Sequence, residues 1–316
     1  MANRTPIVDG MTPRDRLMAM AVAAAWGINF PATHVALEHF PPLLMAAVRF
    51  TLLAVPTMLF IPRPDVPMRW LLGYGVGFGI LQFAFLYLGM EHGMPAGLAS
   101  LVLQSSAPFT VLLGAMLIGE RLTRRQVAGV LVAVAGLAGI AVHRSLHAGL
   151  LPIVLTLCGG LGWALGNLAS RQAHPPKPLH LTLWMSVVPP LPMLALSLAV
   201  EGPHAQWHAL STVTTGDGPA ACLALLYIVV VATVLGSGAW TVLLSRYPAG
   251  VVAPFSMLVP VVGIGSSWLF LSESTDWVEL VFGGLVVAGV LTGARTRRRA
   301  GRVVTPATAS VPVPVP

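Results

Sequence analysis

Ten apolar runs, each about 20 residues long, follow one another along the chain. They are continuous, whereas the strands of a membrane barrel alternate polar and apolar side chains in shorter segments. Charged residues make up only 9% of the chain, far below the quarter or so that soluble domains carry. The runs lie at 16–37, 41–61, 69–91, 95–118, 125–143, 149–170, 179–200, 219–243, 248–271 and 276–295. The sequence therefore predicts an all-α integral membrane protein with ten transmembrane helices.

The second half of the chain repeats landmarks of the first half at a fixed distance. The tripeptide Pro-Ala-Gly at 95–97 opens a run that closes at Glu120, and the same tripeptide at 248–250 opens one that closes at Glu273. Both landmarks move by 153 positions. Because each half has an odd number of runs, the halves enter the membrane from opposite sides, as in many secondary transporters. We predict a first five-helix repeat at 16–143 and a second, inverted one at 149–295.

The distribution of basic residues predicts the orientation. With the N-terminus placed inside, 16 of the 18 Lys and Arg residues fall on the inner side, Arg144 falls outside and Arg49 lies within a run. Such a bias marks the cytoplasmic side of a membrane protein. We therefore expect residues 1–15 to form a cytoplasmic N-terminus and residues 296–316 to form a basic, disordered cytoplasmic tail.

The connections between the runs are short except for residues 201–218. This polar loop contains Pro203 and Gly216, and Pro219 follows it, so we expect it to contain no helix. The loop accounts for a change of offset along the repeat, because Trp26 and Trp163 are only 137 positions apart.

The substrate site of an inverted-repeat transporter lies near mid-membrane, where both halves contribute side chains. The first run offers Trp26 and Asn29, and the equivalent sixth run offers Trp163 and Asn167. A ring and an amide suit a small zwitterion, because the amide bonds a charged group and the ring covers the apolar part. The alternative is that the Trp residues mark an interface and the Asn residues bond neighbouring helices.

The third and fourth runs add further candidates to this site. Tyr74, Phe78, Gln82 and Phe85 follow one another at spacings that place them on one helical face. Core packing would explain the rings equally well, but an amide within hydrocarbon needs a partner. Gln82, and Gln104 in the fourth run, therefore complete the predicted substrate-binding set.

Prolines inside two equivalent runs are candidate hinges. Pro108 in the fourth run and Pro254 and Pro260 in the ninth each remove a backbone hydrogen bond one turn upstream. Such weak points can act as gates, and a static kink is the alternative.

Arg49 is the only basic residue deep within a run. On insertion scales such a charge costs about 2.5 to 3.5 kcal/mol. No run contains a carboxylate that could pair with it, so we expect either backbone carbonyls or the carboxylate of a substrate to satisfy its guanidinium group.

No catalytic or metal-binding constellation is found in the sequence. There is no G-x-S-x-G elbow and no H-E-x-x-H helix, and the His pairs 143/147 and 204/208 lie in loops without a third ligand. We therefore expect no enzyme activity, no cofactor, no metal ion and no nucleic-acid partner. The expected partners are a small-molecule substrate and the lipid bilayer, and a homodimer is left open.

Several strings resemble the EamA family of the drug/metabolite transporter superfamily. They are Trp26-Gly27-Ile28-Asn29-Phe30, Arg49-Phe50, Glu120-Arg121-Leu122, Gly166-Asn167 after Trp163, and the sequence GMPAGLASLVLQ at 93–104. The last is similar to bacterial exporters of cysteine and O-acetylserine, which have relatives that export aromatic amino acids. The resemblance implies ten spans in the bacterial inner (plasma) membrane, cytoplasmic termini, and export of amino acids or closely related metabolites.

Two alternatives to amino-acid export are weighed. A related carrier of phosphorylated sugars or of drugs would share the fold, but phosphate recognition usually recruits several Lys or Arg, and the runs offer only Arg49. A membrane-embedded enzyme would need a nucleophile, base or metal set that the sequence lacks.

Overall fold

The structure is a computed structural model that describes residues 11–145, 149–247 and 249–294, and all regular secondary structure within these residues is helical. Within these ranges nine helices are long and apolar enough to cross a membrane, and a further apolar helix, Trp277–Gly293, is shorter. The chain is therefore an all-helical membrane protein, as the sequence predicted. Most of the predicted N-terminal segment and the whole predicted tail lie outside the described residues.

The two halves of the chain contain similar but not identical series of helices. Those of the first half are α1 (Pro13–Leu37), α2 (Pro42–Phe60), α3 (Met68–Tyr74), η1 (Gly75–Leu81), α4 (Gln82–Glu91), α5 (Ala96–Val102), η2 (Leu103–Ser105), α6 (Ser106–Ile118) and α7 (Arg124–Ser145). Those of the second half are α8 (Leu151–Gln172), α9 (Pro178–Met185), α10 (Pro190–Val200), α11 (Pro203–Ser211), α12 (Gly218–Leu226), η3 (Tyr227–Leu235), α13 (Gly236–Arg246), α14 (Ala249–Val252), η4 (Ala253–Met257), α15 (Leu258–Leu271) and α16 (Trp277–Ala294). Elements that follow without a gap form one long helix, such as α3, η1 and α4.

Helix irregularities occur at equivalent places in the two halves. η1 and η3 are π-helical, and η2 and η4 are 3-10 turns. A shift of 153 residues carries η1 into η3 and makes η2 overlap η4. η2 lies one turn before Pro108. η4 contains Pro254 and lies one turn before Pro260. Both 3-10 turns therefore lie where a proline removes a helical hydrogen bond. The helices thus change to 3-10 geometry near these prolines, and the role of the prolines as hinges stays a prediction.

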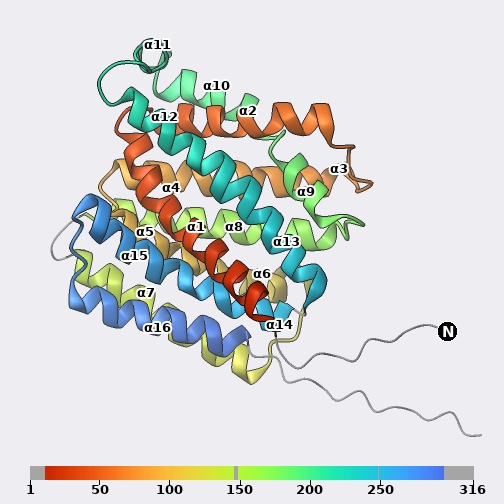
Figure 1. The fold of residues 1–316 in the computed structure, drawn as a ribbon. Coiled ribbons are helices and arrows are strands. Elements are labelled where there is room, and N and C mark those ends of the chain that lie inside the picture. Colours follow the sequence, from red (N-terminus) through yellow and green to blue (C-terminus); the bar gives the residue numbers. More distant parts are fainter. Residues whose placement is uncertain (1–10, 146–148, 248, 295–316) are drawn as a thin grey trace, which may run out of the picture.

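The long helices lie side by side between two ends of a bundle (Figure 1). α1 packs on α15, α2 on α10, α5 on α15, α7 on α16, and α8 on the helix α3–η1–α4. The α11 end is the end at which α1 stops and α2 and α5 start. The basal end is the opposite one, where α1 starts and α16 stops (Figure 1).

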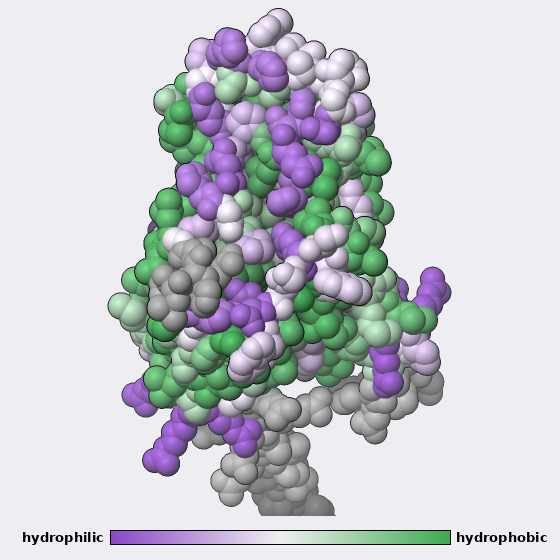
Figure 2. Space-filling model, turned by 90° about the vertical axis from the view of Figure 1, so that its left-hand side faces the viewer, coloured by the Kyte–Doolittle hydropathy of each residue, from purple (hydrophilic) through white to green (hydrophobic). Residues whose placement is uncertain are grey.

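The surface of the bundle is apolar along its sides and polar at its ends. Phe60 and Met116 are each 78% exposed, whereas Tyr87 is fully buried. Figure 2, which looks onto the α11 end, shows hydrophilic residues in a band down its middle and hydrophobic residues along its flanks. Exposed apolar sides with polar ends are what a lipid bilayer requires of a helical bundle.

The connection between α10 and α12 contains the helix α11, so the expectation of an irregular loop was wrong. Pro203 occupies the first helical position, where its fixed φ fits and its missing N–H has no helical partner to lose. Gly202 turns the chain with φ 83°, a value that glycine takes readily. Pro203 thus starts a helix here instead of breaking one.

Candidate functional site

A row of aromatic rings runs along the third long helix, Met68–Glu91, which consists of α3, η1 and α4. It consists of Tyr74, Phe78, Phe83 and Tyr87, whose neighbouring ring centroids are 5.4, 5.8 and 5.5 Å apart. The sequence predicted a continuation through Gln82 and Phe85 instead. Because η1 is π-helical, its hydrogen bonds span one residue more than in an α-helix, and the face moves on by one position. Phe83 and Tyr87 therefore take the places expected for the other two.

Two further rings close on this row from other helices. Trp163 of α8 meets Phe78 edge to face, with centroids 5.8 Å apart, and Phe50 of α2 lies 5.3 Å from Phe83. Of the predicted site residues, the structure thus brings Tyr74, Phe78 and Trp163 into one cluster. No sequence pattern indicated Phe83 at this place, because only the π-helical turn brings its ring there.

Arg49 lies beside the ring row and joins the two halves of the chain. Its Nη1 donates to the Tyr87 hydroxyl at 2.5 Å, and its Nη2 donates to Thr233 Oγ1 on η3 at 3.1 Å. The guanidinium carbon stands 4.0 Å from the centroid of the Phe83 ring, a cation–π contact. Side-chain hydroxyls and a ring, not backbone carbonyls, therefore satisfy most of this group. Arg49 Nε is buried and bonds to none of the described residues.

Trp26 and Asn29 of α1 make separate contacts. Trp26 Nε1 donates to the Ala232 carbonyl at 2.8 Å, and its ring lies 5.1 Å from that of Trp240. Both partners belong to the eighth long helix along the chain, Gly218–Arg246, which consists of α12, η3 and α13. Asn29 Oδ1 is buried and has no hydrogen-bond partner within the described part of the chain.

The three remaining amide candidates are Asn167, Gln104 and Gln82, and they differ in whether the protein itself supplies a partner. Asn167 Nδ2 donates to Thr110 Oγ1 at 3.3 Å, and Gln104 Nε2 lies 3.6 Å from Met257 Sδ. Gln82 is 4% exposed, and its Oε1 is unpaired among the residues that the structure covers. Gln82 and Asn29 thus offer two buried acceptors, whereas Asn167 has a structural partner.

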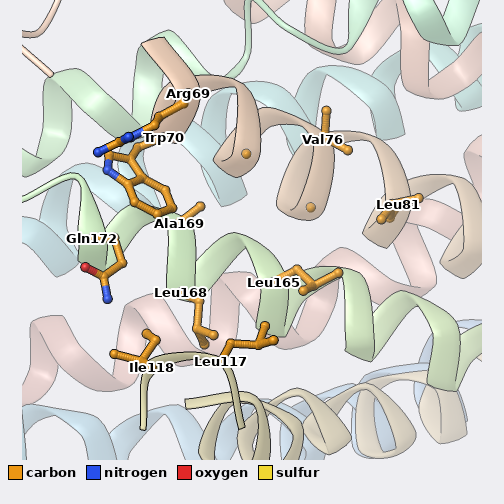
Figure 3. A pocket seen from close by; sticks show the side chains of 12 residues that line it. Arg69, Trp70, Val76, Leu81, Leu117, Ile118, Leu165, Leu168, Ala169 and Gln172 are labelled. Carbon is orange, nitrogen blue, oxygen red and sulfur yellow. The ribbon is translucent and has the colours of Figure 1, made fainter. Parts of the chain in front are cut away.

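A groove of about 710 Å³ lies toward the basal end, between α3–η1, the end of α6 and α8 (Figure 3). Its lining is mainly apolar, and Arg69, with its guanidinium carbon 5.2 Å from the Trp70 ring centroid, and Gln172 lie near one end of it. None of the predicted substrate-binding residues lines this groove. We therefore place the candidate site at the ring cluster and not here.

Asp15 makes a polar contact at the basal end that sequence reasoning missed. Its carboxylate accepts from Arg246 Nη1 at 2.9 Å and from the Tyr247 hydroxyl at 2.6 Å, which ties α1 to the end of α13. The only sequence signal was the presence of one acid and one Arg-Tyr pair at the edges of two different runs. Their proximity depends on the packing of helices more than 200 residues apart.

The chain matches the EamA-like transporter family over residues 16–142 and 150–292. It is 42% identical over 300 residues to a "Probable amino-acid metabolite efflux pump" of Salmonella typhimurium, covering 92% of this chain and 99% of that protein. A "Probable terminal-alkyne amino-acid exporter" of Streptantibioticus cattleyicolor is 28% identical, over 89% of this chain and 94% of that protein. A solved crystal structure with 19% identity and a TM-score of 0.56 covers 89% of this chain and 96% of the other, a likeness of fold alone.

Proposed function

The chain belongs to the EamA-like transporter family, and on that premise we propose that it exports amino-acid metabolites from the cytoplasm by alternating access. It is a multi-pass membrane transporter and not an enzyme, and the family match confirms both predictions. The relative from Salmonella typhimurium, 42% identical over nearly its whole length, is named for the efflux of amino-acid metabolites. That similarity supports the substrate class.

The observation that carries the proposed site is a set of buried polar atoms that lack partners among the described residues. Asn29 Oδ1 and Gln82 Oε1 are acceptors, and Arg49 Nε is a donor on a charged group. A stranded buried polar atom costs about 1 to 3 kcal/mol, so a bound ligand that pairs with these atoms is favoured. A zwitterion has a group for each kind of atom. Its ammonium group can donate to the amide oxygens of Asn29 and Gln82, and its carboxylate can accept from Arg49.

The aromatic cluster completes this site in the proposal. Phe78 and Trp163 would cover the apolar part of the substrate, and Tyr74 would extend that surface. Trp26, Gln104 and Asn167, which have protein partners here, would line the same path. A phosphorylated substrate fits poorly, since Arg49 is the one basic residue deep within the spans.

The proposed topology has ten membrane-spanning helices in two inverted five-helix repeats, with both termini in the cytoplasm of a bacterial cell and the helices in its inner membrane. The charge bias of the sequence supports it. We expect cysteines introduced at Ser211 and Ser310 to be labelled by an impermeant reagent from opposite sides of the membrane. Labelling of both from one side would contradict the topology. Light scattering of the purified protein distinguishes a monomer from a homodimer.

Counterflow in proteoliposomes tests the function directly. A panel of small and aromatic amino acids, their acetylated derivatives and a sugar phosphate is offered to the wild type and to Gln82→Ala, Asn167→Ala and Trp163→Ala. We expect flux of amino-acid metabolites but not of the sugar phosphate, and weaker binding by about tenfold in Gln82→Ala. Trp163→Ala should favour bulkier substrates, because the ring is a steric limit.

Asn167 serves as the internal comparison in this experiment. Its amide already has a protein partner in Thr110, so Asn167→Ala should weaken binding less than Gln82→Ala. Flux of the sugar phosphate alone would overturn the substrate class. Unchanged kinetics in all three variants would place the site elsewhere.

A further inference from the structure

A carboxylate of the second half binds the first turn of a helix of the first half. Glu273 Oε1 accepts from the Ala96 N–H at 2.9 Å, and Oε2 accepts from the Gly97 N–H at 3.0 Å. The first N–H groups of a helix have no partner within it, and the positive end of the helix dipole favours an anion. These two charge-assisted bonds hold the end of α15 against the start of the long helix Ala96–Ile118 at the α11 end.

Gly97 makes this approach sterically feasible. A Cβ built at residue 97 would stand 3.1 Å from the Ile264 Cα and 3.6 Å from Glu273 Oε2. The first contact is closer than an ordinary van der Waals separation, and it is with backbone, which cannot give way easily. The repeated tripeptide thus supplies a helix start, set by Pro95, and a small residue that lets the backbone of α15 come close to that start.

A second carboxylate makes the same kind of bond at the same end. Glu201 follows α10 in the second half, and it accepts from the Leu43 N–H at 2.6 Å and the Leu44 N–H at 3.1 Å, at the start of α2. Ser197 donates its hydroxyl to Glu201 and so fixes the carboxylate. Two helix starts of the first half are thus held by acids of the second half.

The equivalent carboxylates at the basal end are not engaged in this way. Glu120 stands 153 positions before Glu273, but it accepts from Arg171 Nη2 at 2.8 Å and its side chain is 45% exposed. Asp65 stands 136 positions before Glu201, as Pro42 stands before Pro178. It is exposed and makes no side-chain hydrogen bond to any residue that the structure describes.

The burial of the two equivalent helix starts differs in the same sense. All ten residues from 96 to 105 are buried, whereas of residues 251–258 only Val252 is buried. In an inverted repeat, the equivalent positions of the fourth and ninth long helices lie at corresponding depths in the bilayer. The difference in burial between them therefore reflects how tightly the protein is closed at each end. The α11 end is shut around Glu273, and the basal end is open around the start of the ninth long helix.

We propose that Glu273 and Glu120 are alternating gate residues of the transport cycle. Glu273 closes the α11 end by binding the start of the fourth long helix, and Glu120 closes the basal end by binding the N–H groups of Ala249 and Gly250, which begin the continuous helix 249–271. The two bonds exclude each other because closing one end of the bundle separates the helices at the other end. This inference rests on alternating access in the proposed function. Arg171 holds Glu120 while the basal end is open.

Two cysteine reporters at equivalent positions test this mechanism without any substrate. They are Ser100→Cys, at a site that is 1% exposed on α5, and Ala253→Cys, 153 positions later, at an exposed site. Each is placed in a chain whose own Cys158 and Cys222 are replaced by Ala. The rate of maleimide labelling in detergent then reports how often each end opens, regardless of orientation or transport.

Glu273→Ala should raise the labelling rate of Ser100→Cys by about tenfold or more and lower that of Ala253→Cys, since two charge-assisted bonds are lost from one state alone. Glu120→Ala is the matched control, the same residue type at the equivalent place. It should leave Ser100→Cys slow, because Glu120 is disengaged when the α11 end is shut.

An unchanged Ser100→Cys rate in Glu273→Ala, or an equal rise in Glu120→Ala, would overturn the proposal. If Glu273→Ala does not give a monodisperse protein, Glu273→Gln keeps one acceptor oxygen and should give an intermediate rate. A wild-type rate in Glu273→Gln would then overturn the proposal as well. Failure of the substrate assay leaves these labelling rates interpretable, so the two proposals fail separately.

Discussion

The third and eighth long helices are equivalent in the repeat, yet they meet their neighbours in different ways. The third packs backbone to backbone on α8. A Cβ built on Gly77 would stand 2.5 Å from the Gly166 nitrogen, and one built on Gly162 would stand 2.8 Å from the Gln82 nitrogen. Small residues at such an interface let two helices approach as closely as their main chains permit.

The eighth long helix contacts α1 through side chains. Trp26 Nε1 donates to the Ala232 carbonyl at 2.8 Å, and the Tyr227 hydroxyl donates to the Ala25 carbonyl at 2.9 Å. Ala232 lies within π-helical η3. Large side chains therefore span this contact, with Trp26 lying against Gly236 of the eighth long helix. Glycines of both helices line the equivalent contact.

The same backbone irregularity thus serves two purposes. Against α8 the π-helical turn rests on glycines and cannot shift without steric clash, so the third long helix and α8 move as one body. Against α1 the contact depends on two hydrogen bonds to carbonyls, which can be broken and remade at modest cost. We expect the motion of the transport cycle to occur at this second contact, between α1 and the eighth long helix.

The largest effect is expected from filling the glycine contact. Gly77→Ala places a methyl group 2.5 Å from the backbone of α8, and overpacking of this kind costs about 1 to 3 kcal/mol. Gly238→Ala in α13 is the matched control, because a Cβ there would meet nothing within 4 Å. Thermal unfolding in detergent should show a clearly lower Tm for Gly77→Ala alone. Equal Tm values for Gly77→Ala and Gly238→Ala would mean that the third long helix and α8 are not tightly packed.

Removing the charge of Arg49 should have the next largest effect. Arg49→Leu removes the hydrogen bonds to the fully buried Tyr87 hydroxyl and to Thr233 on η3, a loss of about 1 to 3 kcal/mol, and should reduce counterflow at least tenfold. Arg49→Lys keeps the charge without the planar fork and should retain part of the flux. Arg69→Leu, at an exposed basic residue, is the control. Wild-type flux in Arg49→Leu would show that this link between the halves is dispensable.

The sequence predicted the helices well, because apolar runs of membrane-spanning length leave few alternatives. Their ends fall within a few residues of those expected. The repeat at 153 residues also located the carboxylates at 120 and 273, although it did not reveal that only one of them binds a helix start. That difference belongs to the conformation and not to the sequence pattern.

The site was predicted less completely, for a definite physical reason. An α-helical period places Gln82 and Phe85 after Phe78, but the π-helical turn moves the ring face to Phe83 and Tyr87. Gly-rich sequence permits such a turn without marking it. The partners of Arg49 were likewise hidden, because Thr233 comes from the other half and depends on packing.

The smallest effect is expected at the contact between α1 and the eighth long helix. Its size shows how far this contact differs in rigidity from the contact between the third long helix and α8. Trp26→Phe keeps a ring beside Trp240 but removes the donor to the Ala232 carbonyl, and Tyr227→Phe removes the donor to the Ala25 carbonyl. Each loss should cost about 0.5 to 1.5 kcal/mol, and the double variant measures how far the two bonds depend on each other, since Ala25 and Trp26 are neighbours in the chain.

Thermal unfolding of the single and double variants, beside Gly77→Ala, measures this difference. If each single change lowers the Tm less than Gly77→Ala, the second contact is the softer of the two. The transport rate should then change more than the stability, because breaking and remaking these bonds is part of the motion. A single change as damaging as Gly77→Ala would show that both contacts are equally rigid, and the motion would have to lie elsewhere in the bundle.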